Sequence, residues 1–325
     1  MKEKILDLLR SAEDYLSGQE ICEQFGVSRT AVWKVIRQLE EEGYVIDAVR
    51  NRGYRLIQEP DVLNTDRIRA CLHTKWAGRT LMYFDSIDST NAEAKRQAEN
   101  GAVHGLLVIS DHQTAGRGRR GRVWESQKGD GIFMTLLLKP DIEPMNASML
   151  TLVMGLAVRE ALAQVDNLDV QIKWPNDIVC NGKKICGILT EMSAQMDFIN
   201  HIVIGLGINV YNETFPPEMD HIAASIYQQT GVRIRRAELI AEVMERFETY
   251  YAQYLKTQNL FYLMDIYNEH LINRGRKVQV LDAKAGFTGT AIGINEAGEL
   301  LVQTDEGIRA VSAGEVSVRG VYGYV

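Results

Sequence analysis

Residues 113–122 constrain the fold of this chain more than any other stretch, because they suit neither a helix nor a strand. They read Gln-Thr-Ala-Gly-Arg-Gly-Arg-Arg-Gly-Arg, with four arginines and three glycines. Without a Cβ, Gly116, Gly118 and Gly121 permit positive φ and close approach to a ligand, and successive N–H groups can form an anion-binding concavity. Arginine forks suit carboxylate or phosphate. Alone, the loop is equally compatible with a solvated basic linker or a nucleic-acid-binding segment.

Length and charge limit the classes of protein that need consideration. A chain of 325 residues exceeds one ordinary core, so we expect two or three domains. The net charge of −7 excludes a protein coated by nucleic acid and restricts any DNA contact to a local patch. Charged residues interrupt the start of the chain, and the longest apolar run, 149–158, is too short to span a membrane, so we expect a cytoplasmic protein. The cysteines lack metal or disulfide spacing and are expected to be buried thiols: Cys22, Cys71, Cys180 and Cys186.

The first 60 residues carry the pattern of a helix-turn-helix. Ile5, Leu8, Leu9 and Ala12 recur at helical spacing. Ser17 and Glu20 have the spacing of a capping box, which predicts a second, short helix that stops at Gly26. Ser28 can cap a third helix, whose apolar stripe is Val32, Val35, Ile36 and Leu39. Two helices joined by a glycine turn are typical of this motif, whose second helix enters the major groove.

A predicted basic hairpin follows the third helix. Residues 44–46 and 54–57 read as strands joined through residues 50–53, and the arrangement resembles the winged helix-turn-helix family. The third helix is basic between residues 28 and 39, which suits phosphates. A protein-interaction module is the alternative, and Trp33 could be either core or base-contacting. One unit reads a half-site, so specific binding requires a dimer. The candidate DNA contacts are Ser28, Arg29, Thr30, Lys34, Arg37 and Arg52.

The basic loop is expected to be held between two buried strands, which would make it a rigidly mounted site. Residues 106–110 lead into it and residues 132–138 follow it. Upstream, a strand over 81–84 runs into a turn and a helix, with Ser89, Thr90 and Asn91 where the helix begins. Hydroxyls at that place are explained equally well by helix capping and by ligand contact.

Two adjacent lysines open a later strand. Residues 173–177 end one strand in a tight turn, and Asn181-Gly182 is a strong hairpin signal. Alternation then places Lys184 on the face of Cys186 and Ile188, and Lys183 on the opposite face. This pattern does not choose between the lysines, and either could be a solvated strand end. A further strand over 204–210 contains Gly205 and Gly207, which allow close backbone approach.

The end of the chain is expected to form a small β domain. Helices are predicted over 235–256 and to about residue 270, as cover for the central sheet. Short strands are then predicted over 277–281, 286–292, 300–303 and 308–311, which is typical of a small barrel. A purely stabilising role for this barrel is as compatible with the sequence as a role in binding.

The order and wording of these segments resemble the biotin–protein ligase family, in its bifunctional bacterial form that also represses transcription. The loop Gly-Arg-Gly-Arg-Arg-Gly joined to Lys-Trp-Pro-Asn-Asp is the most specific part of the match. The resemblance covers nearly the whole chain and rests on residues 88–91, 113–122 with Trp124, 173–177, 184–187, 205–209 and 314–319. It implies an α+β multidomain protein, with a winged helix-turn-helix (1–60), a mixed α/β ligase domain of class II synthetase type (65–270) and an SH3-like barrel (271–325).

The resemblance also implies a reaction and its residues. Biotin and Mg·ATP would give biotinyl-5′-AMP and pyrophosphate, and the acyl group would pass to a lysine of the biotin carboxyl carrier protein. Lys184 and Arg119 are the implied catalytic residues, and Asp177 or a neighbour is a candidate for positioning nucleotide or metal, with no direct protein ligand for metal identified. The implied biotin and adenylate contacts are Ser89, Thr90, Asn91, Gln113, Gly116, Arg117, Gly118, Arg119, Lys184 and Gly187.

The family also implies regulation. Biotinyl-AMP would act as corepressor by favouring a homodimer on operator DNA, with no membrane partner. Two alternatives remain at this level: a lipoate ligase, whose catalytic domain is related, and a ligand-sensing repressor that has lost catalysis. The wording of the Gly-Arg loop favours the biotin enzyme over the lipoate enzyme.

Overall fold

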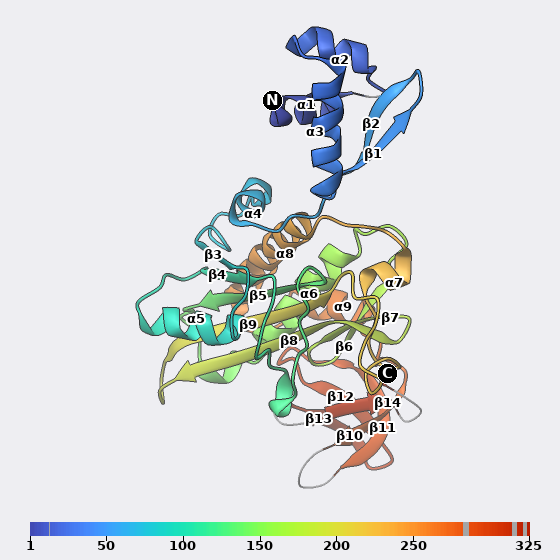
Figure 1. The fold of residues 1–325 in the computed structure, drawn as a ribbon. Helices are drawn as coiled ribbons and strands as arrows, with labels where there is room; N and C mark the ends of the chain where they lie inside the picture. The colour runs from blue at the N-terminus through green and yellow to red at the C-terminus, as the bar shows by residue number, and fades with distance from the viewer. Residues whose placement is uncertain (13, 282–285, 314–316, 321–323) are drawn as a thin grey trace. The chain divides into compact units, whose positions relative to one another are not determined.

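The computed structural model describes residues 1–12, 14–281, 286–313, 317–320 and 324–325. The chain divides into two compact units, Met1–Val62 and Leu63–Val325 (Figure 1). The boundary follows closely on the polar segment 58–61, which contains Pro60. Because the second unit contains both the central and the last sheet, the predicted boundary at residue 271 stays a prediction.

The first unit is a three-helix core with a two-stranded hairpin, as predicted. Ser17 and Glu20 form the capping box, and Ser28 caps the third helix by accepting from the Ala31 N–H. One detail was wrong: the first helix buries Leu6 rather than Leu8, and Ala12 lies past its end. The elements are α1 (Lys2–Ser11), α2 (Gly18–Phe25), α3 (Arg29–Glu41), β1 (Val45–Val49) and β2 (Gly53–Gln58).

The hairpin is tied to the turn that precedes α2. Leu16 pairs with Tyr54 through two backbone hydrogen bonds of 2.8 and 2.9 Å. Gly53 has φ +115°, and a Cβ at this position would lie 2.0 Å from the Leu16 carbonyl oxygen. Only glycine therefore fits where the wing turns back. Trp33 is 51% exposed, which answers the question the sequence left open: it is not a core residue.

The second unit is built on a seven-stranded mixed sheet (Figure 1). Only the β3–β4 pair is parallel among its neighbouring strands, and the others pair antiparallel. Two strands distant in sequence, β5 and β9, lie side by side at its centre. In spatial order the strands are β3 (Leu81–Phe84), β4 (Leu107–Ser110), β5 (Gly131–Leu138), β9 (Ile199–Asn209), β8 (Lys183–Ala194), β7 (Asp177–Cys180) and β6 (Val170–Lys173).

The two faces of this sheet are covered differently. Leu136, Ile202 and Ile204 face the large core shared with α6 and α8, whereas Leu137 and Val203 face a smaller cluster under α5. Alternation along β5 and β9 produces this division. Glycines at 205 and 207 lie on the α5 face, so that face has room for a cavity. The helices are α4 (Thr65–Cys71), α5 (Thr90–Glu99), α6 (Met149–Leu162), α7 (Ile226–Thr230), α8 (Arg236–Thr257) and α9 (Met264–Glu269).

A five-stranded antiparallel sheet closes the chain, in the order β13-β12-β11-β10-β14. Its buried residues, such as Val278 and Val302, belong to the same hydrophobic cluster as the central sheet. Residues 314–316 of the last family motif lie outside the described residues. Closure of this sheet into a barrel stays a prediction. The strands are β10 (Lys277–Leu281), β11 (Phe287–Ile294), β12 (Leu300–Thr304), β13 (Gly307–Val311) and β14 (Ser317–Gly320).

The cysteines and helices bear on two further expectations. All four cysteines are free; Cys180 and Cys186 are buried as predicted, whereas Cys22 and Cys71 are only partly buried, against the prediction. None of the helices in the described ranges is long and apolar enough to cross a bilayer.

Candidate active site

One pocket gathers nearly all of the side chains that the sequence singled out. It opens over the glycine-bearing face of β8 and β9, beside the start of α5 and under the basic loop. Nine predicted residues line it, and Gly116 does not. The full lining is Ser89, Thr90, Asn91, Gln113, Arg117, Gly118, Arg119, Trp124, Asn176, Lys184, Gly187, Ile188, Leu189, Gly205, Leu206 and Gly207.

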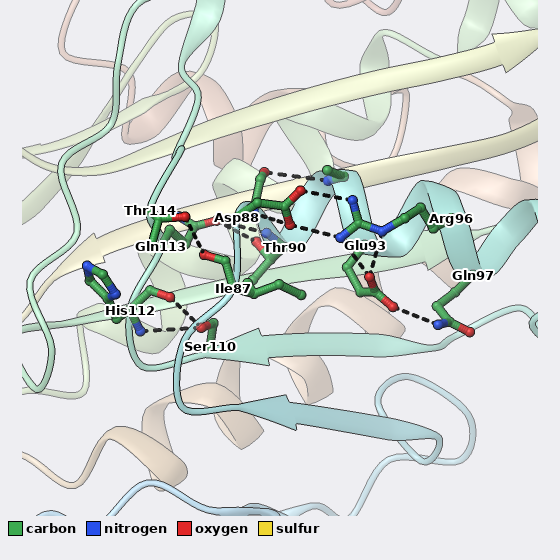
Figure 2. Close-up of polar contacts among 12 residues, drawn as sticks. Ile87, Asp88, Thr90, Glu93, Arg96, Gln97, Ser110, His112, Gln113 and Thr114 are labelled. Carbon is green, nitrogen blue, oxygen red and sulfur yellow. Dashed lines mark hydrogen bonds and ion pairs between the residues drawn. The ribbon is translucent and has the colours of Figure 1, made fainter.

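The start of α5 is fastened to the start of the basic loop (Figure 2). Gln113 accepts hydrogen bonds through Oε1 from the Thr90 N–H at 2.9 Å and the Thr90 hydroxyl at 3.1 Å. Thr114 and Ile87 are joined by a backbone hydrogen bond of 2.8 Å. Ser89 caps the helix, as the simpler interpretation of its hydroxyl required. These contacts fix the position of Gln113 relative to the helix before any ligand binds.

Asn91 is held by a polar network that the sequence did not reveal. Its Oδ1 accepts from the Thr135 hydroxyl at 2.7 Å, and its Nδ2 donates to Glu191 at 2.8 Å. Lys95 holds the same carboxylate at 2.5 Å. A Cβ on Gly205 would lie 2.0 Å from Asn91 Oδ1, so this network needs glycine there. Thr135 was recognisable as a lone hydroxyl inside the apolar stretch 132–138.

The indole of Trp124 covers two glycines of the sheet. A Cβ on Gly207 would lie 2.4 Å from the ring, and one on Gly187 would lie 2.8 Å from it. The indole N–H of Trp124 is buried and has no hydrogen-bond partner among the described residues. The ring therefore forms an apolar wall of the pocket, in a segment that the sequence placed only within a motif.

Lys184, and not Lys183, reaches this pocket. Its Nζ lies 5.2 Å from the centre of the Trp124 ring and 2.6 Å from Asp177 Oδ1, whereas Lys183 donates to the Asp220 carbonyl. The predicted face was wrong, because Lys184 lies against Gly187 rather than beside Cys186. A bulge is the reason: Ile178 pairs with Cys186 and Val179 with Lys184, which leaves Ile185 unpaired and reverses the alternation.

A buried carboxylate anchors the positive charges at this end of the pocket. Burial by itself would raise the pKa of Asp177, but Lys184, Lys173 and the hydroxyl of Tyr324 outweigh burial and hold that pKa below its usual range. Burial lowers the pKa of Lys173 to about 8, and the positive charges of Lys184, Arg319 and Arg119 act in the same direction. This end of the pocket is therefore positively charged, and the Asp177 carboxylate partly neutralises the lysines beside it.

Arg119 is anchored at both ends of its guanidinium. It donates to Asn176 Oδ1 at 2.9 Å and to the Ala313 carbonyl at 3.0 Å, and burial lowers its pKa. The loop is therefore tied both to the β6–β7 turn and to the segment that follows β13. Arg117, in contrast, is exposed at the rim of the pocket.

The glycines of the loop fulfil the prediction only in part. Only Gly121 adopts positive φ, together with the neighbouring Arg120 at +59°. A Cβ on Gly116 would lie 2.4 Å from the Trp124 carbonyl oxygen, so this glycine is needed for packing of the loop on itself. The N–H groups of Thr114, Ala115 and Gly118 donate to carbonyls of the chain, so these three groups are already engaged within the protein.

The first unit presents its candidate contacts on one helix. Ser28, Arg29, Thr30, Lys34 and Arg37 are all exposed at or beyond the start of α3. Arg29 donates to Gln19 of α2 at 3.0 Å, and Arg37 lies over the exposed Trp33 ring at 5.5 Å.

Arg52, on the wing, differs from these helix residues. It lies 3.2 Å from Asp14 and stacks over Tyr15 at 4.3 Å. Its place in a DNA interface stays a prediction.

Relatives of known name match the chain from end to end. The "Bifunctional ligase/repressor BirA" of Bacillus subtilis is 40% identical over 321 residues, which cover 98% of both chains. The protein of the same name from Escherichia coli is 30% identical and covers 97% of this chain and 96% of its own. The chain belongs to the bifunctional biotin ligase/repressor family.

Domain and structure matches agree with the family membership. Residues 83–209 match the Biotin/lipoate A/B protein ligase family, residues 2–55 an HTH domain, and residues 275–319 the Biotin protein ligase C terminal domain. The Aquifex aeolicus biotin protein ligase, solved in complex with biotin and ATP, is 31% identical with a TM-score of 0.66. It covers 74% of this chain and 99% of its own.

The described side chains of the pocket do not form a group that would bind a metal by itself. Within the described ranges, no group of three His, Cys, Asp or Glu side chains could hold an ion. Both oxygens of Asp177 are engaged, Oδ1 by Lys184 and Oδ2 by Tyr324. A role for Asp177 or a neighbour in positioning nucleotide or metal stays a prediction, whereas the contact that the structure does show is with the cation Lys184.

Proposed function

We propose that this chain is an ATP-dependent biotin–protein ligase and also a DNA-binding repressor. The observation that carries the enzymatic part is the pocket in which Lys184 and Arg119 meet the apolar wall of Trp124 and the polar turn at Ser89–Asn91. Such a pocket can take a small molecule with a polar head, an apolar middle and an anionic end. Biotin has this arrangement, with a ureido ring, a hydrocarbon chain and a carboxylate.

The first step joins the biotin carboxylate to the nucleotide. A carboxylate oxygen attacks the α-phosphorus of ATP, the bond to the β-phosphate oxygen breaks, and pyrophosphate leaves with its electron pair. Both reactants are anions, so fixed positive charge is needed to bring them together. Lys184 has three N–H donors, so it can keep its contact with Asp177 while donating to the carboxylate and the α-phosphate. Arg119, held by Asn176, adds a second charge.

The second step transfers the acyl group to a lysine of the biotin carboxyl carrier protein. The uncharged lysine amine attacks the acyl carbon, AMP leaves with the bridging oxygen, and the amine proton passes to solvent or phosphate. Water would hydrolyse the mixed anhydride, so the site must cover it between the steps. Trp124 and the loop around Gly116, Arg117 and Gly118 are suited to that cover.

Magnesium enters this scheme with the nucleotide. ATP polyphosphate binds Mg²⁺ through its own oxygens, and cations of this kind keep several waters. The engaged oxygens of Asp177 and the basic character of the pocket fit a metal carried by phosphate rather than held by protein. Its contribution when bound is to neutralise the charge on the leaving pyrophosphate.

The regulatory proposal rests on the first unit and on the adenylate. A single helix-turn-helix reads a half-site, so repression of biotin genes requires a homodimer on paired half-sites. Biotinyl-AMP, by ordering the basic loop, acts as the corepressor that favours this dimer. The work of the protein on ATP, carrier protein and operator DNA would take place in the cytoplasm. Sedimentation equilibrium tests the dimer: association unchanged by biotinyl-AMP would contradict it.

Isotope exchange from pyrophosphate into ATP tests the enzymatic proposal. Exchange that depends on biotin and not on lipoate supports a biotin ligase, exchange with lipoate indicates a lipoate ligase, and none with either indicates a repressor without catalysis. Lys184→Gln should slow biotin-dependent exchange by about 100- to 1,000-fold, because one fixed donor at developing charge is lost. Lys183→Gln is the matched control, since that lysine bonds only to the Asp220 carbonyl in the described structure, and it should exchange normally.

A further inference from the structure

Tyr324 contacts the reacting end of the pocket from the far end of the sequence. Its hydroxyl donates to Asp177 Oδ2 at 2.5 Å, while the other oxygen of the same carboxylate lies 2.6 Å from Lys184 Nζ. Tyr324 and Asp177 are 147 residues apart in the chain. One carboxylate therefore connects a tyrosine outside the pocket lining to the lysine inside it.

The ring of Tyr324 is also held in place. Lys173 Nζ lies 4.2 Å from the ring centre and donates to the Val318 carbonyl at 3.1 Å. The neighbouring Val325 packs at the β7–β8 turn, where a Cβ on Gly182 would lie 3.3 Å from it. Burial raises the pKa of the Tyr324 phenol, so the hydroxyl keeps its proton and remains a donor.

We propose that Tyr324 is a positioning residue for Lys184 and acts through Asp177. A carboxylate that accepted from Lys184 alone could rotate about its terminal bond and carry the ammonium with it. The Tyr324 hydroxyl fixes this rotation by holding the second oxygen. Because reaction rates depend steeply on the placement of the reacting groups, a fixed ammonium raises the rate of adenylation beyond what its charge alone supplies. This inference rests on the adenylation chemistry proposed above.

The electrostatic surroundings of the carboxylate decide how the contact can be tested. The hydrogen bond from Tyr324 lowers the pKa of Asp177, together with the larger effects of Lys184 and Lys173. Loss of the hydroxyl should therefore raise that pKa, so that the carboxylate takes up a proton at a higher pH than in the wild type. The charged and titratable groups around Asp177 and Tyr324 are Lys173, Lys184, Arg119, Cys186, Arg122 and Arg319.

Tyr324→Phe is the direct test, because it removes the hydroxyl and keeps the ring against Lys173. We expect kcat for biotin-dependent pyrophosphate exchange to fall by about tenfold, with KM for biotin and ATP nearly unchanged. The acidic limb of the kcat profile should move to higher pH. Tyr254→Phe is the matched control: it also removes a buried hydroxyl, which donates to the Asn146 carbonyl at 3.0 Å, and it should leave both readouts unchanged.

A double-mutant cycle separates positioning from general loosening of the structure. In an Asp177→Asn background, Tyr324→Phe should cost little more, because the carboxylate through which it acts is already gone. Equal losses in both backgrounds would overturn the proposal. So would an unchanged kcat and pH profile, or a faster enzyme, which would show that residues 324–325 obstruct the site.

A readout without catalysis keeps this test separate from the proposed function. A ¹³C NMR titration of the Asp177 carboxyl should give a higher pKa in Tyr324→Phe than in the wild type, and equal values would overturn the proposed contact. Absence of biotin-dependent exchange by the wild-type protein would instead contradict the proposed function, and it would remove the role of Tyr324 in catalysis with it.

Discussion

The indole of Trp124 occupies the space that a side chain at position 207 would need. A Cβ built on Gly207 would lie 2.4 Å from the ring, closer than any real Cβ contact. The ring is part of a short segment anchored by a hydrogen bond of 3.0 Å from the Trp124 N–H of the backbone to the Gly116 carbonyl. The position of the basic loop over the sheet therefore depends on glycine, which has no side chain, at position 207 of β9.

Gly207→Ala should displace this loop without unfolding the protein. The added methyl group meets a rigid ring rather than the end of a flexible side chain, so Trp124 must move. We expect KM for biotin to rise by at least about tenfold and stability to fall by about 1–3 kcal/mol, as in other overpacked sites. Steady-state kinetics and urea unfolding measure the two effects.

Gly155→Ala is the matched control for this substitution. Gly155 lies in helix α6, and a Cβ on it would contact Ile188 Cδ1 of the sheet at an ordinary distance of 3.7 Å. Both KM and stability should stay close to wild type or improve slightly, because alanine favours a helix. A normal KM in Gly207→Ala would show that the ring position does not matter for binding.

Much of the site could be predicted because its parts are local in sequence. The loop 113–122, the helix start at Ser89 and the hairpin at Asn181-Gly182 each carry their own backbone signal, and all three were found. Residue-type patterns also gave most strands of the central sheet. What brings these parts together is long-range pairing, such as β5 against β9, and no local pattern encodes that order.

The parts of the site that could not be predicted from the sequence depend on exceptions to regular geometry. A bulge at Ile185 turns Lys184 toward Gly187, and strict alternation cannot predict a bulge. Tyr324 is joined to Asp177 by a side-chain contact across 147 residues, with no motif around it. The sequence does show a lysine at position 173, at the end of an apolar strand. The structure buries it, and a buried ammonium needs partners.

Arg119→Gly should loosen retention of the adenylate while leaving its synthesis possible. The substitution removes the hydrogen bonds to Asn176 and to the Ala313 carbonyl, which tie the loop to its surroundings. We expect faster release of biotinyl-AMP, on the order of 10- to 100-fold, as two hydrogen bonds of a charged group are lost. Trapping of released adenylate by a chemical amine measures it.

Arg120→Gly provides the control for the loss of charge and for added flexibility. Arg120 is exposed and already has φ +59°, a region that glycine adopts readily, so the loop should keep its shape. Release should match the wild type. Equal acceleration in both variants would show that flexibility of the loop, and not the anchoring of Arg119, controls retention.

Lys173 should make the stability of the protein depend on pH in the alkaline range. Its folded pKa of about 8 lies below its ordinary value of 10.5, so the folded state disfavours the charged form. Between these values the unfolded chain binds the proton that the folded chain has released, and stability rises with pH. The stability gained in this way is complete above pH 10.5 and is lost as the pH falls through 8.

Comparison with Lys173→Met isolates this contribution from that of other groups. Methionine nearly preserves the shape of the side chain but cannot titrate. The free energy of unfolding of the wild type minus that of the variant should rise by about 3 kcal/mol between pH 8 and 10.5. Urea unfolding at several pH values measures the difference, and a constant difference would contradict a depressed pKa.

The basic side of α3 should carry DNA binding independently of ligation. Arg29 and Lys34 are exposed on this helix, which has no acidic residue in its first turn. A side chain that neutralises one phosphate releases about one counterion, so Arg29→Ala or Lys34→Ala should reduce the slope of log Kd against log salt by about one. Binding should weaken roughly three- to tenfold near physiological salt, while biotin-dependent exchange is unchanged.

Lys2→Gln separates a local contact from the general effect of removing a positive charge. Lys2 belongs to the same unit, but it is paired with Glu42 at 2.7 Å and lies in α1 rather than in α3. Fluorescence anisotropy with labelled operator DNA over a salt series should show a wild-type slope for this variant. An equal loss of slope in Lys2→Gln would mean that net charge alone attracts the duplex. Wild-type slopes in all three variants would favour the alternative, in which the first unit binds protein rather than DNA.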